Sequence, residues 1–573
     1  MNIPRPEYPR PDFARTEWIN LNGTWEHETD HGKSGRARGL SSPDRALSDT
    51  ITVPFCRESV LSGIGDVDFC ECVWYRRAVT LPEGWLADGR RTHLHIGACD
   101  YHTQVWVNGI SVGTHIGGYV EFSFDITHAL SEAGENIITV CATDELRTDN
   151  QPGGKQCRDY HSRGCSYTRT TGIWQTVWLE NTPDAYLTGA KYYPSISDRK
   201  LSIELTAANA DGLVARAEAF YEGRAVGAAA AVIEGKSCRI EMKLDELHLW
   251  EVGAGRLYDL RLTLGEDGDC VESYFGMRSV ACEDGIMLLN GKKVFQRLVL
   301  DQGFYPDGIY TARDESELIA DIERSLACGF NGARLHQKIF EPRFLYHCDR
   351  LGYIVWGEHG NWGLDISRPE AWQGFLPEWL EALGRDFNHP AIIGWCPLNE
   401  TQLNQNPEFV KALASLTRAT DPTRLYIDAS GWRHVDGVSD IIDLHNYEQD
   451  PDKFAAYLAP TARGEAIEMP RHGTGYRACP TFVSEYGGIR WAPAEDKGWG
   501  YGEAPKSEEE FLDRFARLAK VILDNPRMGG LCYTQLTDVE QEVNGLYTYH
   551  RELKFDAAIL RAALTAPAAV EEA

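Results

Sequence analysis

The sequence lacks both a long hydrophobic run and an excess of positive charge. Its longest weakly apolar stretch, AVGAAAAVI at 225–233, is far shorter than the ~20 residues that a membrane-spanning helix needs. Lysine and arginine number 57 against 85 aspartates and glutamates, which gives a net charge of −28. This balance argues against nucleic acid or an anionic membrane as a partner, because both require local positive charge. It fits a soluble protein with a neutral ligand.

The 15 cysteines also lack the paired spacing of a zinc ribbon, so free buried thiols explain them better. The first residues, MNIPRPEYPRPDF, have no apolar core of the kind that a secretory signal contains. Cys157 and Cys165 lie in one loop and could form a disulfide, but without an export signal we expect reduced thiols. We therefore expect a cytoplasmic protein.

At 573 residues the chain is too long for one hydrophobic core. Residues 1–182 alternate apolar and polar side chains, as in TQVWVNG (103–109), which ends in the hairpin-turn dipeptide Asn-Gly. Many short strands without a long helical period are typical of a jelly-roll-like β-sandwich. Residues 183–282 continue the alternation, as in KLSIELTA (200–207), and predict a smaller immunoglobulin-like sandwich.

From about residue 283 the hydrophobic period becomes helical. Helices are predicted at 314–329, 341–351, 371–386, 407–420, 507–524 and 556–565. The apolar runs between them are KVFQRLVLD (293–301), NGARLH (331–336), YIVWGEH (353–359), IIGWCPLNE (392–400), RLYIDAS (424–430), IIDLHNY (441–447), TFVSEYG (481–487) and GLCYTQL (530–536). Eight strands that alternate with helices predict a (β/α)₈ TIM barrel at 283–573, whose fifth crossover is too short for a full helix.

Polar residues that end the strands of such a barrel meet at one mouth. Glu400 ends the fourth strand and Glu485 the seventh. Other candidates at this mouth are Asp301, Arg334, His336, Glu358, His359, Asn399, His445, Tyr447 and Gln535, with the aromatic residues Trp356, Trp362, Tyr486 and Tyr533. Two facing carboxylates suit glycosidic cleavage: a protonated one gives its proton to the leaving oxygen, and an ionised one attacks the anomeric carbon.

Interpretations without glycosidic catalysis must also be considered. Each glutamate alone could be a solvated loop carboxylate. A non-catalytic carbohydrate-binding protein would be expected to lose one glutamate, and both are present. His336, His359 and His445 lack a His-Glu-x-x-His or comparable spacing, so sugar-binding histidines explain them better than zinc does. We expect an enzyme that needs no metal and no other cofactor.

Several motifs carry a resemblance to a known family: NHPAIIGWCPLNE (388–400), FVSEYGG (482–488), VWVNG (105–109), TTGIWQTVWLE (170–180) and YTQLTDVEQEVNGL (533–546). They resemble glycoside hydrolase family 2, which includes β-galactosidases, β-glucuronidases and β-mannosidases. The resemblance covers nearly the whole chain and implies a retaining exo-β-glycosidase with Glu400 as acid/base and Glu485 as nucleophile. It further implies that Asn399 holds the 2-hydroxyl of the sugar, that Tyr447 hydrogen-bonds the nucleophile, and that Arg334 lies near it.

The sugar is less well defined. Many β-glucuronidases of the family grip the substrate carboxylate with an Asn-x-Lys motif, which GLYTYHRELKFD (545–556) lacks. β-Galactosidases and β-glucuronidases of the family often have a substrate-binding aspartate six residues before the glycine that corresponds to Gly172. In this sequence that position is Ser166. By family frequency we expect a β-galactosidase. A furanosidase (β-D-galactofuranosidase or α-L-arabinofuranosidase) and a β-glucuronidase are the alternatives.

The polar loop 147–170 is too long to be a mere connection. It is either a disordered surface excursion or, as the family resemblance implies, a wall of the barrel mouth that restricts the enzyme to chain ends. Its groups that could bind hydroxyls are Asp159, Tyr160, His161, Arg163, Ser166, Tyr167 and Arg169. In the mouth itself, Trp362 is the best candidate for a sugar platform. Two β-domains joined to a barrel also fit a homo-oligomer, which is common among such enzymes.

Overall fold

The computed structural model describes residues 3–266, 268–402, 404–493 and 498–572. Its N-terminal part is the predicted β-sandwich, with side chains such as Trp25, Leu94 and Val140 packed between a six-stranded and a four-stranded sheet. The larger sheet has the order β3 (Asp49–Val53), β2 (Gly23–Thr29), β4 (Cys72–Val79), β10 (Asn136–Thr143), β7 (His102–Val107), β8 (Ile110–Ile116), and the smaller has the order β1 (Trp18–Asn20), β12 (Val177–Thr182), β5 (Arg91–Ile96), β9 (Phe122–Asp125). Asn108 and Gly109 both have positive φ, as the predicted hairpin turn requires.

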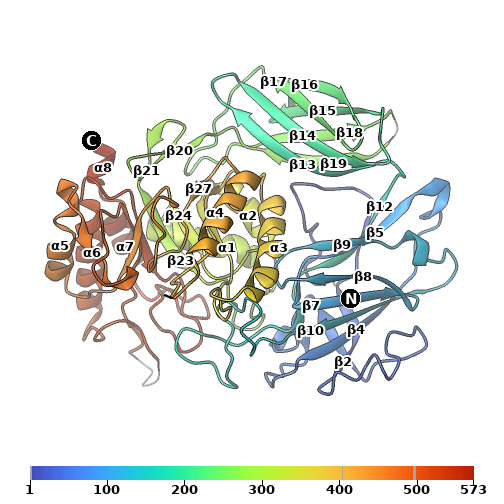
Figure 1. The fold of residues 1–573 in the computed structure, drawn as a ribbon, viewed down its shortest axis with the longest axis horizontal. Coiled ribbons are helices and arrows are strands. Elements are labelled where there is room, and N and C mark those ends of the chain that lie inside the picture. Colours follow the sequence, from blue (N-terminus) through green and yellow to red (C-terminus); the bar gives the residue numbers. More distant parts are fainter. Residues whose placement is uncertain (1–2, 267, 403, 494–497, 573) are drawn as a thin grey trace.

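The second sandwich is also present, and in Figure 1 it lies above the first one and beside the barrel. One sheet is β13 (Tyr186–Ser195), β14 (Lys200–Ala208), β17 (Ser237–Lys243), and the other is β16 (Arg224–Val232), β15 (Val214–Tyr221), β18 (Tyr258–Leu264), β19 (Cys270–Phe275). The alternation predicted for β14 is confirmed, because Leu201, Ile203 and Leu205 are fully buried in the core between these sheets.

The barrel contains eight parallel strands, as predicted. Their hydrogen-bonded order is β27 (Leu425–Tyr426), β26 (Ile392–Cys396), β25 (Ile354–Glu358), β24 (Gly332–Leu335), β23 (Gln296–Asp301), β32 (Gly530–Thr534), β31 (Phe482–Gly487), β28 (Asp443–Asn446). Within the described residues no ladder joins β27 to β28, and residues 427–442 between them contain no helix. The abbreviated fifth crossover is therefore confirmed.

The six predicted helices are also present, within one or two residues of the expected bounds. They are α1 (Glu315–Cys328), α2 (Pro342–Leu351), α3 (Glu370–Arg385), α4 (Pro407–Thr420), α6 (Glu508–Leu523) and α7 (Ala557–Leu564). The prediction missed α5 (Pro451–Leu458), although Asp450 caps it and proline stands at its first position. Among the residues described, no helix is long and apolar enough to cross a membrane.

The N-terminal sandwich is docked on the barrel through buried polar contacts. The Tyr119 amide donates to Glu378 Oε1 of α3 (2.6 Å), and the Thr311 hydroxyl donates to the Trp174 carbonyl (2.6 Å). The Trp174 and Tyr310 rings also touch, with centroids 5.2 Å apart. These contacts hold the β8–β9 loop, which carries Tyr119, and the segment before β12, which carries Trp174, against the barrel.

Candidate functional site

The two candidate glutamates lie together, joined by a histidine. His445 Nδ1, on β28, is 2.8 Å from Glu400 Oε1 and 3.3 Å from Glu485 Oε2. One donor atom from each of the three residues lies within 4.8 Å of the others. Glu485 belongs to β31, and Glu400 follows β26 with a positive φ of 49°. β26 and β31 are not neighbours in the sheet, so the two carboxylates face each other across the mouth.

Glu485 is surrounded by groups that favour its ionised form. Arg334 Nη1 donates to Oε1 (3.1 Å), and the Tyr447 hydroxyl donates to Oε2 (2.5 Å). Burial alone would raise the pKa of Glu485, but its contacts with His445, Arg334 and Tyr447 outweigh burial and lower that pKa to about 2. Glu485 is therefore a buried, ionised carboxylate at neutral pH.

Arg334 organises the floor of the mouth. Its Nε donates to Glu358 Oε1 (2.8 Å) and its Nη2 donates to the side-chain carbonyl of Asn399 (3.1 Å). Glu358 Oε2 is in turn 3.0 Å from His336 Nδ1. Arg334, Glu358 and His336 are each only 2% exposed, so this network fixes the arginine that faces Glu485.

Glu400 is in a more open setting. The side chain of Glu400 is 15% exposed, against 5% for that of Glu485. Among the described residues, the side chain that hydrogen-bonds Glu400 is His445. It lines a cavity of about 690 Å³ together with Trp362, Trp432 and Cys165. The mouth therefore has open space on the side of Glu400.

Asn361 and Trp362 extend the mouth from the end of β25. Asn361 Oδ1 accepts from the Asn399 amide (2.9 Å), and Trp362 Nε1 donates to the Asn399 carbonyl (3.2 Å). Both contacts fix the backbone that carries Asn399 and Glu400. Trp362 is half-buried and lines the cavity, and its role as a sugar platform stays a prediction.

The loop 147–170 is an ordered wall of this mouth. The amides of Gly153 and Gly154 donate to the Trp362 carbonyl (2.8 and 3.1 Å). Gly154 has a φ of 56°, and a Cβ there would lie 2.4 Å from the Gln337 carbonyl oxygen, so the close approach requires glycine. Further along, the Tyr167 hydroxyl donates to Glu542 Oε2 (2.6 Å).

This docking brings Lys155 into the mouth. Its ammonium lies 4.1 Å from the centroid of the Trp362 ring, and the residue is only 5% exposed. Among the described residues no hydrogen bond or ion pair engages its Nζ. It is close enough to Glu542 to lower that carboxyl's pKa, although burial is the larger effect and raises it. Lys155 is thus a buried cation that no anion of the described part of the chain contacts directly.

The other loop candidates do not line the mouth in the same way. Asp159 and Arg163 are exposed and pair with each other, and Tyr160 is 48% exposed. Arg169 is buried, but its guanidinium lies over Phe69 in the sandwich, 3.7 Å from the ring centroid. Cys157 and Cys165 are both free thiols.

Three predicted site residues point elsewhere. His359 is packed on Phe375 (ring centroids 4.4 Å apart) and lies 3.3 Å from Glu378 of α3, behind the barrel wall. Asp301 accepts from the Gly303 amide (2.9 Å), and burial with the nearby Asp321 charge raises its pKa to about 6. Gln535 is fully buried, and its Nε2 donates to Asn544 (2.8 Å). Trp356, Tyr486 and Tyr533 are likewise core residues of the barrel.

Glu400, His445 and Glu485 are also a set of donors that could surround a cation. Their closest atoms are, however, already paired through His445 Nδ1. The expectation that hydrolysis needs no metal stays a prediction.

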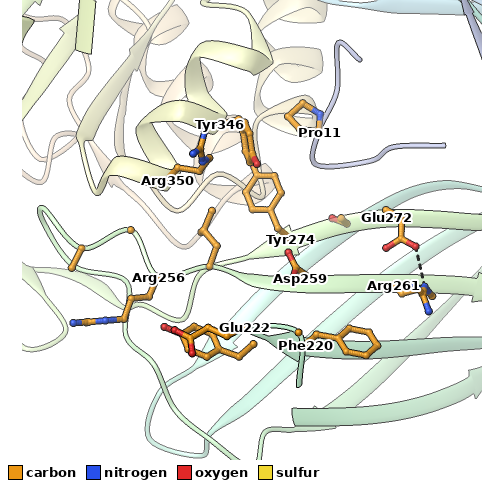
Figure 2. Close-up of a pocket in the computed structure, with 16 residues that line it drawn as sticks. Pro11, Phe220, Glu222, Arg256, Asp259, Arg261, Glu272, Tyr274, Tyr346 and Arg350 are labelled. Carbon is orange, nitrogen blue, oxygen red and sulfur yellow. Dashed lines mark hydrogen bonds and ion pairs between the residues drawn. The ribbon is translucent and has the colours of Figure 1, made fainter. Parts of the chain in front are cut away.

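A larger cavity, of about 860 Å³, lies away from this mouth. Figure 2 shows it between the second sandwich and α2, with Tyr274 and Tyr346 on one side and the Arg261–Glu272 ion pair (2.9 Å) on the other. None of the predicted site residues lines it.

Sequence reasoning missed four residues of the mouth: Lys155, Asn361, Tyr501 and Glu542. Tyr501 stacks on Tyr447, with ring centroids 3.4 Å apart. Asn361 lies in HGNWG (359–363), and Glu542 lies in YTQLTDVEQEVNGL (533–546). Polar residues that follow strand ends could have indicated both. Lys155 comes from another domain and leaves no comparable signal.

Family models match most of the chain in three consecutive segments. Residues 66–183 match the sugar binding domain of glycosyl hydrolases family 2, residues 185–278 match the model described as glycosyl hydrolases family 2, and residues 280–488 match the TIM barrel domain of that family. Similar curated proteins are the β-glucuronidases of Sus scrofa (24% identity; 97% of this chain, 91% of the relative) and Paenibacillus borealis (23%; 97% and 98%).

Solved structures with the same fold include a β-glucuronidase from Ruminococcus gnavus in complex with D-glucuronic acid. It has a TM-score of 0.81 and 18% identity, with 98% of this chain and 100% of that chain covered. The β-glucuronidase of Bifidobacterium dentium complexed with coumarin-3-O-glucuronide gives 0.79 and 21%, with 98% and 99% covered. The predicted order of sandwich, immunoglobulin-like domain and TIM barrel is confirmed, and the chain belongs to glycoside hydrolase family 2, whose members cleave glycosides.

Proposed function

We propose that this chain is a retaining exo-β-glycosidase in which Glu485 is the nucleophile and Glu400 the acid/base. The observation that carries the assignment is the difference in charge compensation between the two carboxylates. Glu485 faces Arg334 and Tyr447 and has a depressed pKa, so it can attack the anomeric carbon as an anion. Glu400 is more exposed and lines the cavity in which a leaving group would lie.

The distance between the carboxylates supports retention. One oxygen of Glu400 lies within 4.8 Å of one oxygen of Glu485. Retaining enzymes hold their carboxyl groups ~5 Å apart, whereas inverting enzymes leave ~6.5–9.5 Å for a water molecule. The docked loop 147–170 walls the mouth on one side, which favours attack on a terminal sugar over cleavage within a chain.

For the sugar we propose a β-glucuronide in place of the β-galactoside expected from family frequency. The curated relatives named above are β-glucuronidases. Although the Asn-x-Lys motif is absent, a uronate carboxylate needs a cation in the mouth, and Lys155 is a buried cation there. We assign Lys155 the role of pairing with that carboxylate.

A panel of p-nitrophenyl glycosides tests this assignment in the wild-type enzyme and in Lys155→Gln. We expect the wild type to have its highest kcat/KM on the β-D-glucuronide. Lys155→Gln should lower kcat/KM on the glucuronide by about 10- to 100-fold more than on the β-D-glucoside, because only the glucuronide loses a charge-assisted contact.

Lys33→Gln is the matched control. Lys33 lies in the same domain but is 38% exposed and pairs with Glu71 and Glu145, so its loss should leave both rates unchanged. If the wild type prefers a galactoside or a furanoside, the proposed β-glucuronide substrate is wrong, but the proposed mechanism still stands. Equal losses on both substrates in Lys155→Gln would show that Lys155 does not pair with the carboxylate.

A further inference from the structure

A chain of buried polar side chains leads from outside the mouth to His445. His434 Nδ1 lies 2.6 Å from Asp428 Oδ1, and His434 Nε2 lies 3.1 Å from Asp443 Oδ1. The Ser430 hydroxyl donates to Asp443 Oδ2 (2.6 Å) and lies 3.0 Å from His445 Nε2. Asp428, Ser430 and Asp443 are fully buried and His434 is 5% exposed, and the mechanism proposed above gives them no task.

His434 determines the charge states of the buried side chains in this hydrogen-bonded series. Burial would lower the pKa of His434, but the charges of Asp428 and Asp443 raise it well above its usual value. The His434 cation in turn lowers the pKa of Asp443, although burial alone would raise it. Asp443 is therefore a carboxylate that can only accept hydrogen bonds.

An accepting Asp443 determines where the protons next to it lie. Ser430 has one hydroxyl proton, and the short contact to Asp443 Oδ2 uses it. The Ser484 hydroxyl also donates its proton to Asp443 Oδ2, so Ser484 does not donate a proton to Ser430 Oγ. The contact between Ser430 Oγ and His445 Nε2 then requires the proton on Nε2. In the neutral ring, Nδ1 presents a lone pair to Glu400.

The fit around His445 leaves the ring no other position. A Cβ at Gly431, which has a φ of 84°, would lie 2.2 Å from His445 Cγ. The ring is 2% exposed. Titratable and charged groups that face it from the neighbouring elements are Glu400, Glu485, Asp443, His434 and His472, with Arg334 behind Glu485. His472 stays neutral at physiological pH, because burial and the His434 charge lower its pKa to about 3.

We propose that Asp443 and Ser430 are positioning residues that hold His445 in the tautomer protonated on Nε2, so that protonated Glu400 donates its hydrogen bond to Nδ1. Glu400 then keeps its proton until the glycosidic oxygen takes it as the bond to the anomeric carbon breaks and the bond to Glu485 forms. The opposite tautomer would donate from Nδ1 to the two carboxylates and favour an ionised Glu400, which cannot act as an acid. The inference rests on the role of Glu400 proposed above.

The tautomer can be observed directly in the wild-type enzyme. Long-range ¹H–¹⁵N correlation of the histidine-labelled protein distinguishes a protonated from an unprotonated ring nitrogen, and the signals that disappear in His445→Gln identify His445. We expect the proton on Nε2 and a proton-free Nδ1 in the neutral ring. A proton on Nδ1 alone would overturn the proposal whatever the activity of Glu400 variants, so its failure is distinct from a failure of the proposed function.

Removal of the Ser430 hydroxyl gives the corresponding kinetic test. Ser430→Ala should move the alkaline limb of the kcat/KM–pH profile to lower pH by about one unit, because without the Ser430 oxygen the ring can carry its proton on Nδ1 and donate it to Glu400. Poor leaving groups should lose more rate than activated ones, and Ser430→Thr, which keeps the hydroxyl, should restore the profile.

Ser325→Ala removes a comparably buried hydroxyl, which contacts Tyr353 on the outer side of the barrel (2.7 Å), and should leave the limb in place. An unshifted limb in folded Ser430→Ala, shown by an unchanged Tm, would contradict the proposal. If Ser430→Ala does not fold, the tautomer observed in the wild type decides.

Discussion

Glu485→Ala is expected to lower kcat by about 10⁴-fold or more on every glycoside that the enzyme hydrolyses. The reason is that Glu485 is the one carboxylate of the described residues that both Arg334 and a phenol contact, so we expect no other side chain to form the glycosyl ester in its place. Because the truncation leaves a space beside the anomeric carbon, azide or formate should restore part of the activity.

With azide the product should be a glycosyl azide of inverted configuration, which NMR can identify. Glu408→Ala, at an exposed glutamate in the first turn of α4, should behave as the wild type. A Glu485→Ala enzyme that keeps more than a few per cent of its activity without added anions would contradict the assignment of the nucleophile.

Glu400→Ala should have the second-largest effect, and its size should depend on the leaving group. Loss of a general acid costs about 10²–10⁴-fold where the leaving oxygen needs a proton. An activated nitrophenolate hardly needs one, so kcat/KM on a dinitrophenyl glycoside should stay close to that of the wild type. The measurement is a series of aryl glycosides of decreasing phenol acidity. Equal losses across the series would mean that Glu400 is not the acid.

Much of the fold and the central pair could be predicted from periodicity and topology. Parallel strands of a barrel end at the same side, so the positions of Glu400 and Glu485 after the fourth and seventh apolar runs were enough to bring them together. Arg334 and Tyr447 followed the same rule and lie on Glu485.

Strand ends alone do not say which way a side chain points. Neighbouring residues of a strand face opposite sides, so Glu358 lies in the mouth while His359 turns outward onto Phe375. The pairing register between β23 and β24 likewise determines which side chains face the mouth. Asp301 pairs with Leu335, whereas Arg334 pairs with Leu300, so Asp301 and Arg334 point to opposite sides of the sheet.

Contacts between domains were the least predictable part of the site. Lys155 reaches the mouth because the amides of Gly153 and Gly154 bind the Trp362 carbonyl, a backbone contact that has no periodic signature. The chain from His434 to His445 likewise depends on the irregular segment after β27, whose path no hydrophobic pattern indicates.

The anomer of the first-formed sugar tests most directly whether the enzyme hydrolyses a β-glucuronide by double displacement with Glu485 as nucleophile. ¹H NMR of p-nitrophenyl β-D-glucuronide hydrolysis, recorded before mutarotation, should show β-D-glucuronic acid appearing first and the α-anomer following later. First appearance of the α-anomer would mean inversion, and with it that a water molecule, and not Glu485, attacks the anomeric carbon.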